Sequence, residues 1–130
     1  MDRLTERRLV AHRALDTFQQ ILREERSPVV RDAAIQRFEY TFEAVWKCAQ
    51  LYLKQEESVE TASPKAVIRH FFQAGFFDEA QARLAAAMVD DRNLTVHTYN
   101  EALAEAIYAR LPEYARLFTV WLAATERKKP

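Results

Sequence analysis

The chain has 130 residues, the size of one domain, and its 49% hydrophobic and 29% charged residues are typical of a folded globular protein. A single glycine excludes glycine-rich phosphate loops and dinucleotide-binding fingerprints and disfavours β-hairpins, because these need residues without a Cβ. Nineteen basic and nineteen acidic side chains give zero net charge, so contact with RNA would need a local basic groove or a partner's surface.

Two long helices are predicted in the first half of the chain. Apolar side chains at three- and four-residue steps predict a first helix from about Asp2 to Glu25. Ser27 followed by Pro28 is a helix-start signal, because a serine hydroxyl can cap the first turn and proline fits its first position. A second helix is therefore predicted from about Pro28 to Glu56, with an inner face made by Ala34, Phe38, Phe42, Val45, Ala49 and Tyr52. Residues 57–62 form the longest predicted loop.

Two shorter helices are predicted next. Ser63 followed by Pro64 repeats the start signal, and Gly75 is expected to end the third helix as a left-handed C-cap. The inward side chains of this helix are expected to be Val67, Ile68, Phe71 and Phe72. Asp78 can cap a fourth helix, which we expect to fade over residues 91–94, ahead of two β-branched residues. One face of the fourth helix is expected to consist of Ala80, Leu84, Ala87 and Met88.

The last predicted helix begins around residues 98–100 and continues through Leu111. Pro112 is expected to break or kink it, because proline has no backbone N–H, before the apolar stripe resumes at Leu117. Residues 128–130, Lys-Lys-Pro, are expected to form a frayed tail. Together these elements predict one all-α domain over residues 1–130, an antiparallel up-and-down four-helix bundle with an additional short helix or a kinked last helix. The abundance of aromatic residues favours contact with a second copy of the chain.

The rest of the composition limits location and redox chemistry. Cys48 is the single cysteine, so it cannot form an intrachain disulfide, and we expect it to be a small core residue. The charged N-terminal residues are not followed by an apolar run, so no signal peptide is expected. No segment reaches the roughly 18 apolar residues of a membrane span, which leaves the cytoplasm as the expected location.

Residues 92–99, RNLTVHTY, place a permanent cation, an amide, an imidazole and a phenol around the predicted junction of the last two helices. An imidazole moves protons near neutral pH, and a guanidinium neutralises charge that develops on phosphate oxygens. Arg92 and His97 could therefore cleave RNA without a metal, with the 2′-hydroxyl attacking its own phosphate. Asn93 could orient the phosphate or the histidine. Because one imidazole cannot readily be both acid and base, a two-fold dimer that offers two copies is mechanistically attractive.

The chain contains a second pair with the same spacing, Arg7 and His12. Residues five apart in an unbroken helix point about 140° away from each other, so this pair is expected to diverge. Arg92 and His97 flank a predicted break, which can turn both side chains toward one pocket. An alternative interpretation stays open, in which Arg92 forms a salt bridge with a neighbouring aspartate, Asp90 or Asp91, and His97 caps the last helix. No set of histidines and carboxylates has convincing ligand spacing, so neither a metal site nor another cofactor is predicted.

These residues also resemble a known family. Arg92-x4-His97-x-Tyr99 matches the complete motif of the HEPN-domain toxins called HepT. Other segments are similar to small proteins known as nucleotidyltransferase substrate-binding subunits, namely QRFEYTFE at residues 36–43, Trp46-Lys47, and Ser63-Pro64-Lys65 with Phe71. The likeness covers nearly the whole chain and is more specific than the Arg/His spacing alone.

The resemblance implies a helical bundle that forms a homodimer with its Arg/His motifs facing across the interface. It also implies a minimal nucleotidyltransferase as cognate partner, which silences a metal-independent ribonuclease toxin by transferring AMP to the motif tyrosine. Carried onto this chain, His97 would be the acid/base, Arg92 the phosphate clamp, Asn93 a supporting polar residue and Tyr99 the AMP acceptor. Two other functions remain in competition, a non-catalytic subunit that presents a substrate to the nucleotidyltransferase and a dimeric scaffold whose motif is structural.

Overall fold

The computed structural model describes residues 2–127 and contains within them five α-helices, one 3₁₀ turn and no β-strand. The elements in chain order are α1 (Arg3–Leu22), α2 (Pro28–Glu57), α3 (Pro64–Gln73), α4 (Glu79–Leu94), the 3₁₀ turn η1 (Thr95–His97) and α5 (Glu101–Thr125). The all-α prediction is confirmed. The tail predicted at residues 128–130 lies outside the described residues.

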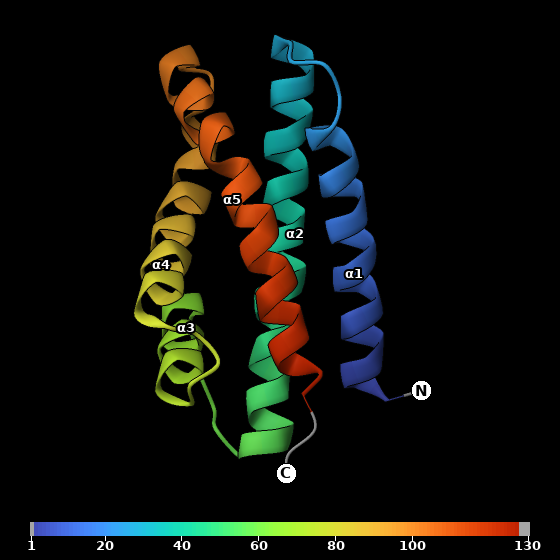
Figure 1. Cartoon of the computed structure of the whole chain (residues 1–130), viewed down its shortest axis with the longest axis vertical. Coiled ribbons are helices and arrows are strands. Elements are labelled where there is room, and N and C mark those ends of the chain that lie inside the picture. Colours follow the sequence, from blue (N-terminus) through green and yellow to red (C-terminus); the bar gives the residue numbers. More distant parts are fainter. Residues whose placement is uncertain (1, 128–130) are drawn as a thin grey trace.

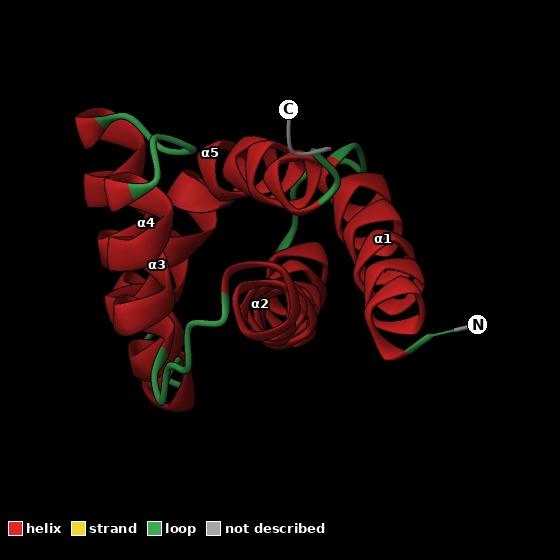
Figure 2. Ribbon diagram, turned by 90° about the horizontal axis from the view of Figure 1, so that it is seen from below, coloured by secondary structure: helices red, strands yellow, loops and turns green. Residues whose placement is uncertain are grey.

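Four of the helices run alternately in opposite directions. Figure 1 shows α1 running up, α2 down, α4 up and α5 down, with the short α3 beside α4. Seen along α2 in Figure 2, α1 lies on one side of this central helix and α3 and α4 lie on the other, while α5 covers a third side. The most extensive contacts of α2 are with α1 and α5. This is the predicted up-and-down bundle with an additional short helix.

The predicted helix starts are confirmed by their caps. The Ser27 hydroxyl accepts a hydrogen bond from the Val30 N–H at 3.0 Å, and Ser63 does the same for Ala66 at 3.2 Å. At the start of α4, Asp78 and Gln81 each accept a hydrogen bond from the other's backbone N–H, at 2.7 and 2.9 Å. Such reciprocal capping satisfies donors that a helix start leaves free.

Aromatic side chains form two packed groups within the core. Phe38, which has no exposed surface, packs against Phe18, Phe42, Phe118 and Tyr114, with ring centroids 5.4–6.4 Å apart. A second aromatic group fills the end where α3 meets α2 and α5, and it consists of Tyr52, Phe71, Phe76, Phe77 and Trp121. The two groups hold α1, α2, α3 and α5 together by burying apolar surface.

Two predicted faces are partly wrong. Phe72 is 44% exposed, because it follows the buried Phe71 by about 100° around α3 and the core takes only one of the two. In α4, Met88 is buried and Leu84 half-buried as expected, but Ala80 and Ala87 are exposed. The buried face of this helix also contains Ala85 and Val89. Alanines are spread around α4, so the apolar pattern does not distinguish between neighbouring faces.

Two helix ends also differ from the prediction. The first helix stops at Leu22 rather than Glu25, and α2 extends one residue beyond the predicted Glu56. Of the break or kink predicted at Pro112, the break is wrong, because α5 continues through this exposed residue as one helix (Figure 1). Packing on both sides of the proline, by Leu111 and Tyr114 among others, outweighs the loss of one backbone hydrogen bond.

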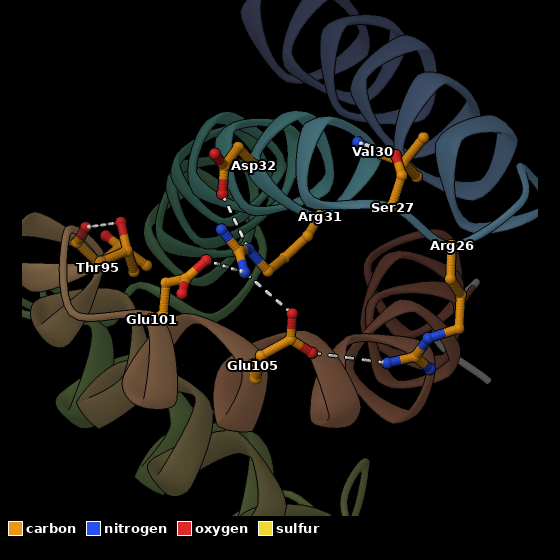
Figure 3. A network of polar contacts seen from close by, with 9 residues as sticks. Arg26, Ser27, Val30, Arg31, Asp32, Thr95, Glu101 and Glu105 are labelled. Atoms are coloured by element: carbon orange, nitrogen blue, oxygen red, sulfur yellow. Dashed lines mark hydrogen bonds and ion pairs between the residues drawn. The ribbon is translucent and has the colours of Figure 1, made fainter.

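A buried arginine joins the start of α2 to the start of α5 (Figure 3). Only 6% of the Arg31 side chain is exposed, and it binds Glu105 at 2.9 Å, Asp32 at 3.0 Å and Glu101 at 3.6 Å. Chiefly the hydrogen bond to Glu105 raises the pKa of Arg31, so the guanidinium stays charged. Nothing near Arg31 in the sequence indicates its contacts with Glu101 and Glu105 of α5. These contacts fix the first turns of α5, which directly follow the candidate site.

Candidate functional site

The predicted junction between the last two helices is present. α4 ends at Leu94, where the Thr95 hydroxyl donates a hydrogen bond to the Arg92 carbonyl at 2.7 Å. The 3₁₀ turn η1 follows, and the Asn100 side chain caps α5 by accepting from the Leu103 N–H at 3.1 Å. The cap of the last helix is therefore Asn100, and not His97 as the alternative interpretation required.

The two aspartates ahead of Arg92 bind residues of other helices. Asp90 lies 2.8 Å from the Lys65 ammonium in α3. Asp91 is buried and accepts two hydrogen bonds from Arg110 in α5, at 2.7 and 2.8 Å, and a third from the Tyr114 hydroxyl. The idea that an aspartate pairs with Arg92 is therefore wrong.

The environment of Tyr114 keeps its hydroxyl protonated. Burial raises the pKa of this phenol, and the hydrogen bond that it donates to Asp91 raises the pKa further. The hydrogen bonds to Asp91 likewise raise the pKa of Arg110. The Asp91 carboxylate therefore lies between a cation and a neutral hydroxyl. Their hydrogen bonds compensate the cost of placing its charge at the edge of the core.

Arg92 is held less closely than Arg31 and Arg110, which form hydrogen bonds of 2.7–3.0 Å with carboxylates. Its terminal nitrogens lie 3.9 Å from a Glu39 oxygen and 3.7 Å from a Glu43 oxygen, both on α2. Its one hydrogen bond among the described residues is a long one, 3.4 Å to the Thr95 hydroxyl, and its buried Nε has no partner there. The two carboxylates partly neutralise the charge of the guanidinium, but they lie beyond hydrogen-bond distance, so most of its N–H groups have no acceptor among the described residues. Such a guanidinium can bind an anion through several hydrogen bonds.

Arg92 and Asn93 lie in the wall of a surface pocket of about 510 Å³, which we call the Arg92 pocket. The other lining residues come from α2, the start of α3 and α4, and they are Phe42, Glu43, Trp46, Ser63, Pro64, Lys65 and Val89. The Trp46 ring donates its N–H to Glu43 at 3.3 Å, which holds the indole beside the carboxylate that faces Arg92. The pocket therefore combines apolar and aromatic walls with two cationic side chains, a combination suited to a ring that carries an anionic group.

His97 and Tyr99 lie on the exposed side of the junction. Tyr99 is 85% exposed, and its hydroxyl is 3.5 Å from Nδ1 of His97, with the two rings edge to face at 6.0 Å. His97 is exposed as well and does not line the Arg92 pocket. The structure thus brings Arg92 together with Asn93 and His97 together with Tyr99. That all four residues act as one site stays a prediction.

Several residues of this site are not evident from the sequence. Glu39 and Glu43 belong to a charged face of α2, on which Glu43 also pairs with Lys47, four residues on, at 3.8 Å. Their relation to Arg92 is not predicted by the sequence. The sequence indicates only that the two acids, four residues or about one helical turn apart, lie on the same face of their helix. Lys65 stands out in the sequence only as part of a family segment.

The other candidate residues of the sequence, the Arg7/His12 pair and Cys48, are not part of this site. His12 binds Glu126 at 2.6 Å, while Arg7 lines a different pocket, in line with the expected divergence of this pair. Burial raises the pKa of the Cys48 thiol to about 11. Within residues 2–127 no three His, Cys, Asp or Glu side chains are grouped closely enough to hold a metal ion. None of the helices described is both long enough and apolar enough to span a bilayer.

An all-α bundle with a polar junction between its last two helices defines the class of protein, and comparison with known proteins specifies the family. Residues 7–127 match the family model described as nucleotidyltransferase substrate binding protein like, and the chain belongs to this family. No functionally curated protein has a significantly similar sequence.

Several solved structures are similar to this chain, among them three that cover 90% or more of it. A protein of Thermus thermophilus is 57% identical, with a TM-score of 0.86, over 90% of this chain and 99% of that one. A Haemophilus influenzae protein, described as showing the fold of a substrate-binding domain of a nucleotidyltransferase, is 20% identical with a TM-score of 0.76, over 92% and 99% of the two chains. A tri-AMPylated HEPN toxin of Shewanella oneidensis, solved with its MNT antitoxin, is 16% identical with a TM-score of 0.77, over 98% and 100%. The last two likenesses concern the fold.

Proposed function

We propose that this protein is a HepT-like toxin, a metal-independent endoribonuclease that acts in the cytoplasm and is regulated by a cognate minimal nucleotidyltransferase. In this proposal Arg92 binds the scissile phosphate, His97 transfers protons and Asn93 supports one of the two. Tyr99 is the residue to which the partner transfers AMP.

The observation that carries the proposal is the state of Arg92. Its side chain is three-quarters buried, yet the guanidinium makes only one long hydrogen bond to a described residue and leaves its Nε unpartnered. In contrast, Arg110 forms two short hydrogen bonds with Asp91. The terminal nitrogens keep free donors, since the nearest carboxylate oxygens are 3.7 and 3.9 Å away, and a charge-assisted hydrogen bond to a bound phosphate oxygen would stabilise the site.

The chemistry needs one proton acceptor and one proton donor. The 2′-hydroxyl loses its proton to an imidazole, and its oxygen forms a bond to the adjacent phosphorus as the bond to the 5′-oxygen breaks. A second, protonated imidazole gives its proton to that leaving oxygen. Two copies of His97, one from each subunit of a homodimer, would supply both groups. Arg92 would balance the charge on the phosphate oxygens in the transition state.

The exposure of Tyr99 supports the proposed regulation. A phenol that is 85% exposed is open to a nucleotidyltransferase, and its hydroxyl lies 3.5 Å from the His97 ring. AMP added there would place bulk and a negative charge beside the imidazole and would repel an RNA phosphate. The fold that this chain shares with the AMPylated toxin of Shewanella is consistent with such a partner.

Expression of the chain in bacteria tests the proposal. We expect wild-type protein to arrest growth and cleave RNA in the presence of a chelator, and both His97→Ala and Arg92→Ala to be harmless. His12→Ala is the matched control, because it removes an exposed histidine whose partner is Glu126, and it should remain toxic. Wild-type protein that is folded, harmless and unable to cleave RNA would refute the ribonuclease proposal.

Co-expression with the cognate nucleotidyltransferase tests the regulation separately. Intact-mass measurement should detect added AMP on the wild-type chain, and Tyr99→Phe should prevent the addition. Tyr40→Phe is the control, since this tyrosine is also exposed but lies outside the motif. AMP on the Tyr99→Phe chain would show that another residue is the acceptor.

The Arg92 pocket favours a second candidate function, that of a non-catalytic subunit which presents a substrate to the nucleotidyltransferase. Trp46 offers a ring surface, and Lys65 and Arg92 offer cationic groups, which together suit a nucleotide-like substrate. Under this hypothesis Trp46→Ala would abolish substrate transfer by the partner, and His97→Ala would have no effect. The toxin hypothesis expects toxicity to depend on His97.

A further inference from the structure

We infer that the chain carries a second anion-binding site, away from the Arg92 pocket, which takes the phosphate backbone of single-stranded RNA. The inference rests on the proposed ribonuclease function. The site is a pocket of about 270 Å³ between α1, α2 and the loop that follows α2, which we call the basic pocket. It is lined by Arg3, Arg7, Lys47, Gln50, Leu51, Lys54, Glu60 and Thr61.

Positive charge predominates in this pocket although the whole chain is neutral. Four of its lining residues are cations and one, Glu60, is an acid. Arg3 and Arg7 lie one turn apart on α1, and neither forms an ion pair with another residue in the described range 2–127. Lys54 has one long ion pair, 3.9 Å to Glu60. Unpaired guanidinium groups on one helix face are the arrangement that a phosphate chain recognises.

The loop wall of the pocket is held in place and contains an unused hydroxyl. Gln50 donates a hydrogen bond to the Thr61 carbonyl at 2.6 Å, and the Val59 N–H binds the Leu53 carbonyl at 3.0 Å. The Thr61 hydroxyl is buried and has no hydrogen-bond partner among the described residues. A threonine hydroxyl can donate to a phosphate oxygen, and because this one is covered, it can do so only if the loop shifts slightly when a phosphate binds.

The basic pocket is connected to the Arg92 pocket through α2. Lys47 lines the basic pocket and pairs with Glu43 at 3.8 Å, while Glu43 lines the Arg92 pocket and faces Arg92 at 3.7 Å. The two sites therefore lie about one helical turn apart on α2. A ligand with several linked phosphates can occupy both sites at once, whereas a single phosphate can occupy only one. This favours an RNA strand over a free nucleotide.

Acidic residues near the basic pocket limit its affinity for phosphate groups. A second pocket of about 300 Å³, which shares Arg3 and Arg7 with the basic pocket, is also lined by Glu6, Val10 and Ala44, so one more carboxylate lies beside the two arginines. We expect moderate affinity that weakens strongly with salt, as is usual for phosphate contacts that release counterions.

Binding should be measured with the full chain in the His97→Ala background, so that RNA is not cleaved. The probe is a short fluorescent single-stranded RNA, followed by anisotropy at several salt concentrations. Replacing both Arg3 and Arg7 by Gln should weaken binding about tenfold at low salt and reduce the log–log salt slope by about 1.4, or 0.7 for each lost contact. The matched control replaces Arg13 and Arg69, two exposed arginines outside the basic pocket, and should change affinity less than about twofold.

Two further measurements make the result decisive. Thr61→Val keeps the shape of the side chain and removes the hydroxyl, and it should weaken RNA binding with no loss of thermal stability. Equal RNA affinity of the Arg3/Arg7 variant and the Arg13/Arg69 control would overturn the site. Binding of ATP or inorganic phosphate that depends on Arg3 and Arg7, without RNA binding, would overturn the assignment to RNA.

Failure of this inference and failure of the proposed function give different results. If wild-type protein cleaves RNA and the Arg3/Arg7 variant binds and cleaves equally well, the basic pocket is wrong and the ribonuclease stands. If the wild type cleaves nothing, yet its RNA binding depends on Arg3 and Arg7, the ribonuclease is wrong and the anion site stands.

Discussion

The hydrogen-bonded group around Asp91 is expected to be the main polar contribution to the stability of the α4–α5 contact. The Asp91 side chain is 7% exposed and accepts hydrogen bonds from Arg110 and from the fully buried Tyr114. Asp91→Ala would remove all three acceptor contacts at once. Asp91→Asn would keep one oxygen for the Tyr114 hydroxyl and lose the negative charge.

The magnitude follows from what each partner loses. Without an acceptor, the buried Tyr114 hydroxyl is left unsatisfied, at a cost of about 1–3 kcal/mol. Arg110 is 45% exposed, so water replaces its lost contacts and its share is reduced to about 1 kcal/mol. We therefore expect Asp91→Ala to lower the free energy of unfolding by about 2–4 kcal/mol, and Asp91→Asn by about 1 kcal/mol.

Urea denaturation followed by circular dichroism measures these changes as shifts of the midpoint at constant slope. The decisive variant is Asp91→Ala combined with Tyr114→Phe, which removes the orphaned hydroxyl and should be more stable than the sum of the two single changes predicts. A loss below about 1 kcal/mol for Asp91→Ala, or strict additivity in the double variant, would refute the assignment.

Three further predictions concern the core and its backbone. Phe38→Ala should lower the free energy of unfolding by about 3–5 kcal/mol in urea denaturation, because this fully buried ring packs against four others, and a loss under about 1 kcal/mol would contradict the packing. Burial raises the pKa of the Cys48 thiol from 9.0 to about 11 in the folded chain. The unfolded chain therefore ionises this thiol first, so the free energy of unfolding is unaffected below pH 9 and declines as the pH rises toward 11. At about pH 10 the free energy of unfolding should be lower by about 1.4 kcal/mol. Cys48→Ala should remove this decline from a plot of unfolding free energy against pH, and equal plots for the two proteins would show that the thiol is not responsible. Gly75→Ala should lower stability by about 1 kcal/mol, because φ is +84° there although a Cβ would meet no atom within 4 Å; an unchanged midpoint would mean that the turn adapts.

The sequence predicts well those features that depend on neighbours within a few residues. Ser27, Ser63 and Asp78 start helices because their side chains bind the N–H three residues ahead, which is a local interaction. The buried face of α4 is harder to predict, because an alanine-rich helix has no clear apolar side. Its orientation is decided by the helices around it, and these are distant in the sequence.

The site is predictable only in part for the same reason. The break after Leu94 follows from local residue types, and it is present. The acids that face Arg92 are about 50 residues away in the chain, and nothing near Arg92 indicates them. The nearby aspartates are the more obvious partners, but the helix directs them elsewhere.

Three consecutive residues of α4 explain how this occurs. Successive side chains on a helix point about 100° apart, so Asp90, Asp91 and Arg92 face three directions. The first binds Lys65 in α3, the second binds Arg110 in α5, and the third faces the acids of α2. These contacts resist rotation of α4 about its axis and therefore fix where the Arg92 side chain enters its pocket.

The residues that follow the helix break are not held in this way. Tyr99 is exposed, and its hydroxyl makes a long contact with His97, itself an exposed residue. Within the proposed function, the phosphate clamp thus lies on a rigid helix end and the proton-transfer residue lies on an accessible turn. A bulky group added to Tyr99 could then obstruct His97 without disturbing the buried contacts of Asp91 or the core. This division predicts that AMP addition changes activity and leaves the thermal stability of the fold unaltered.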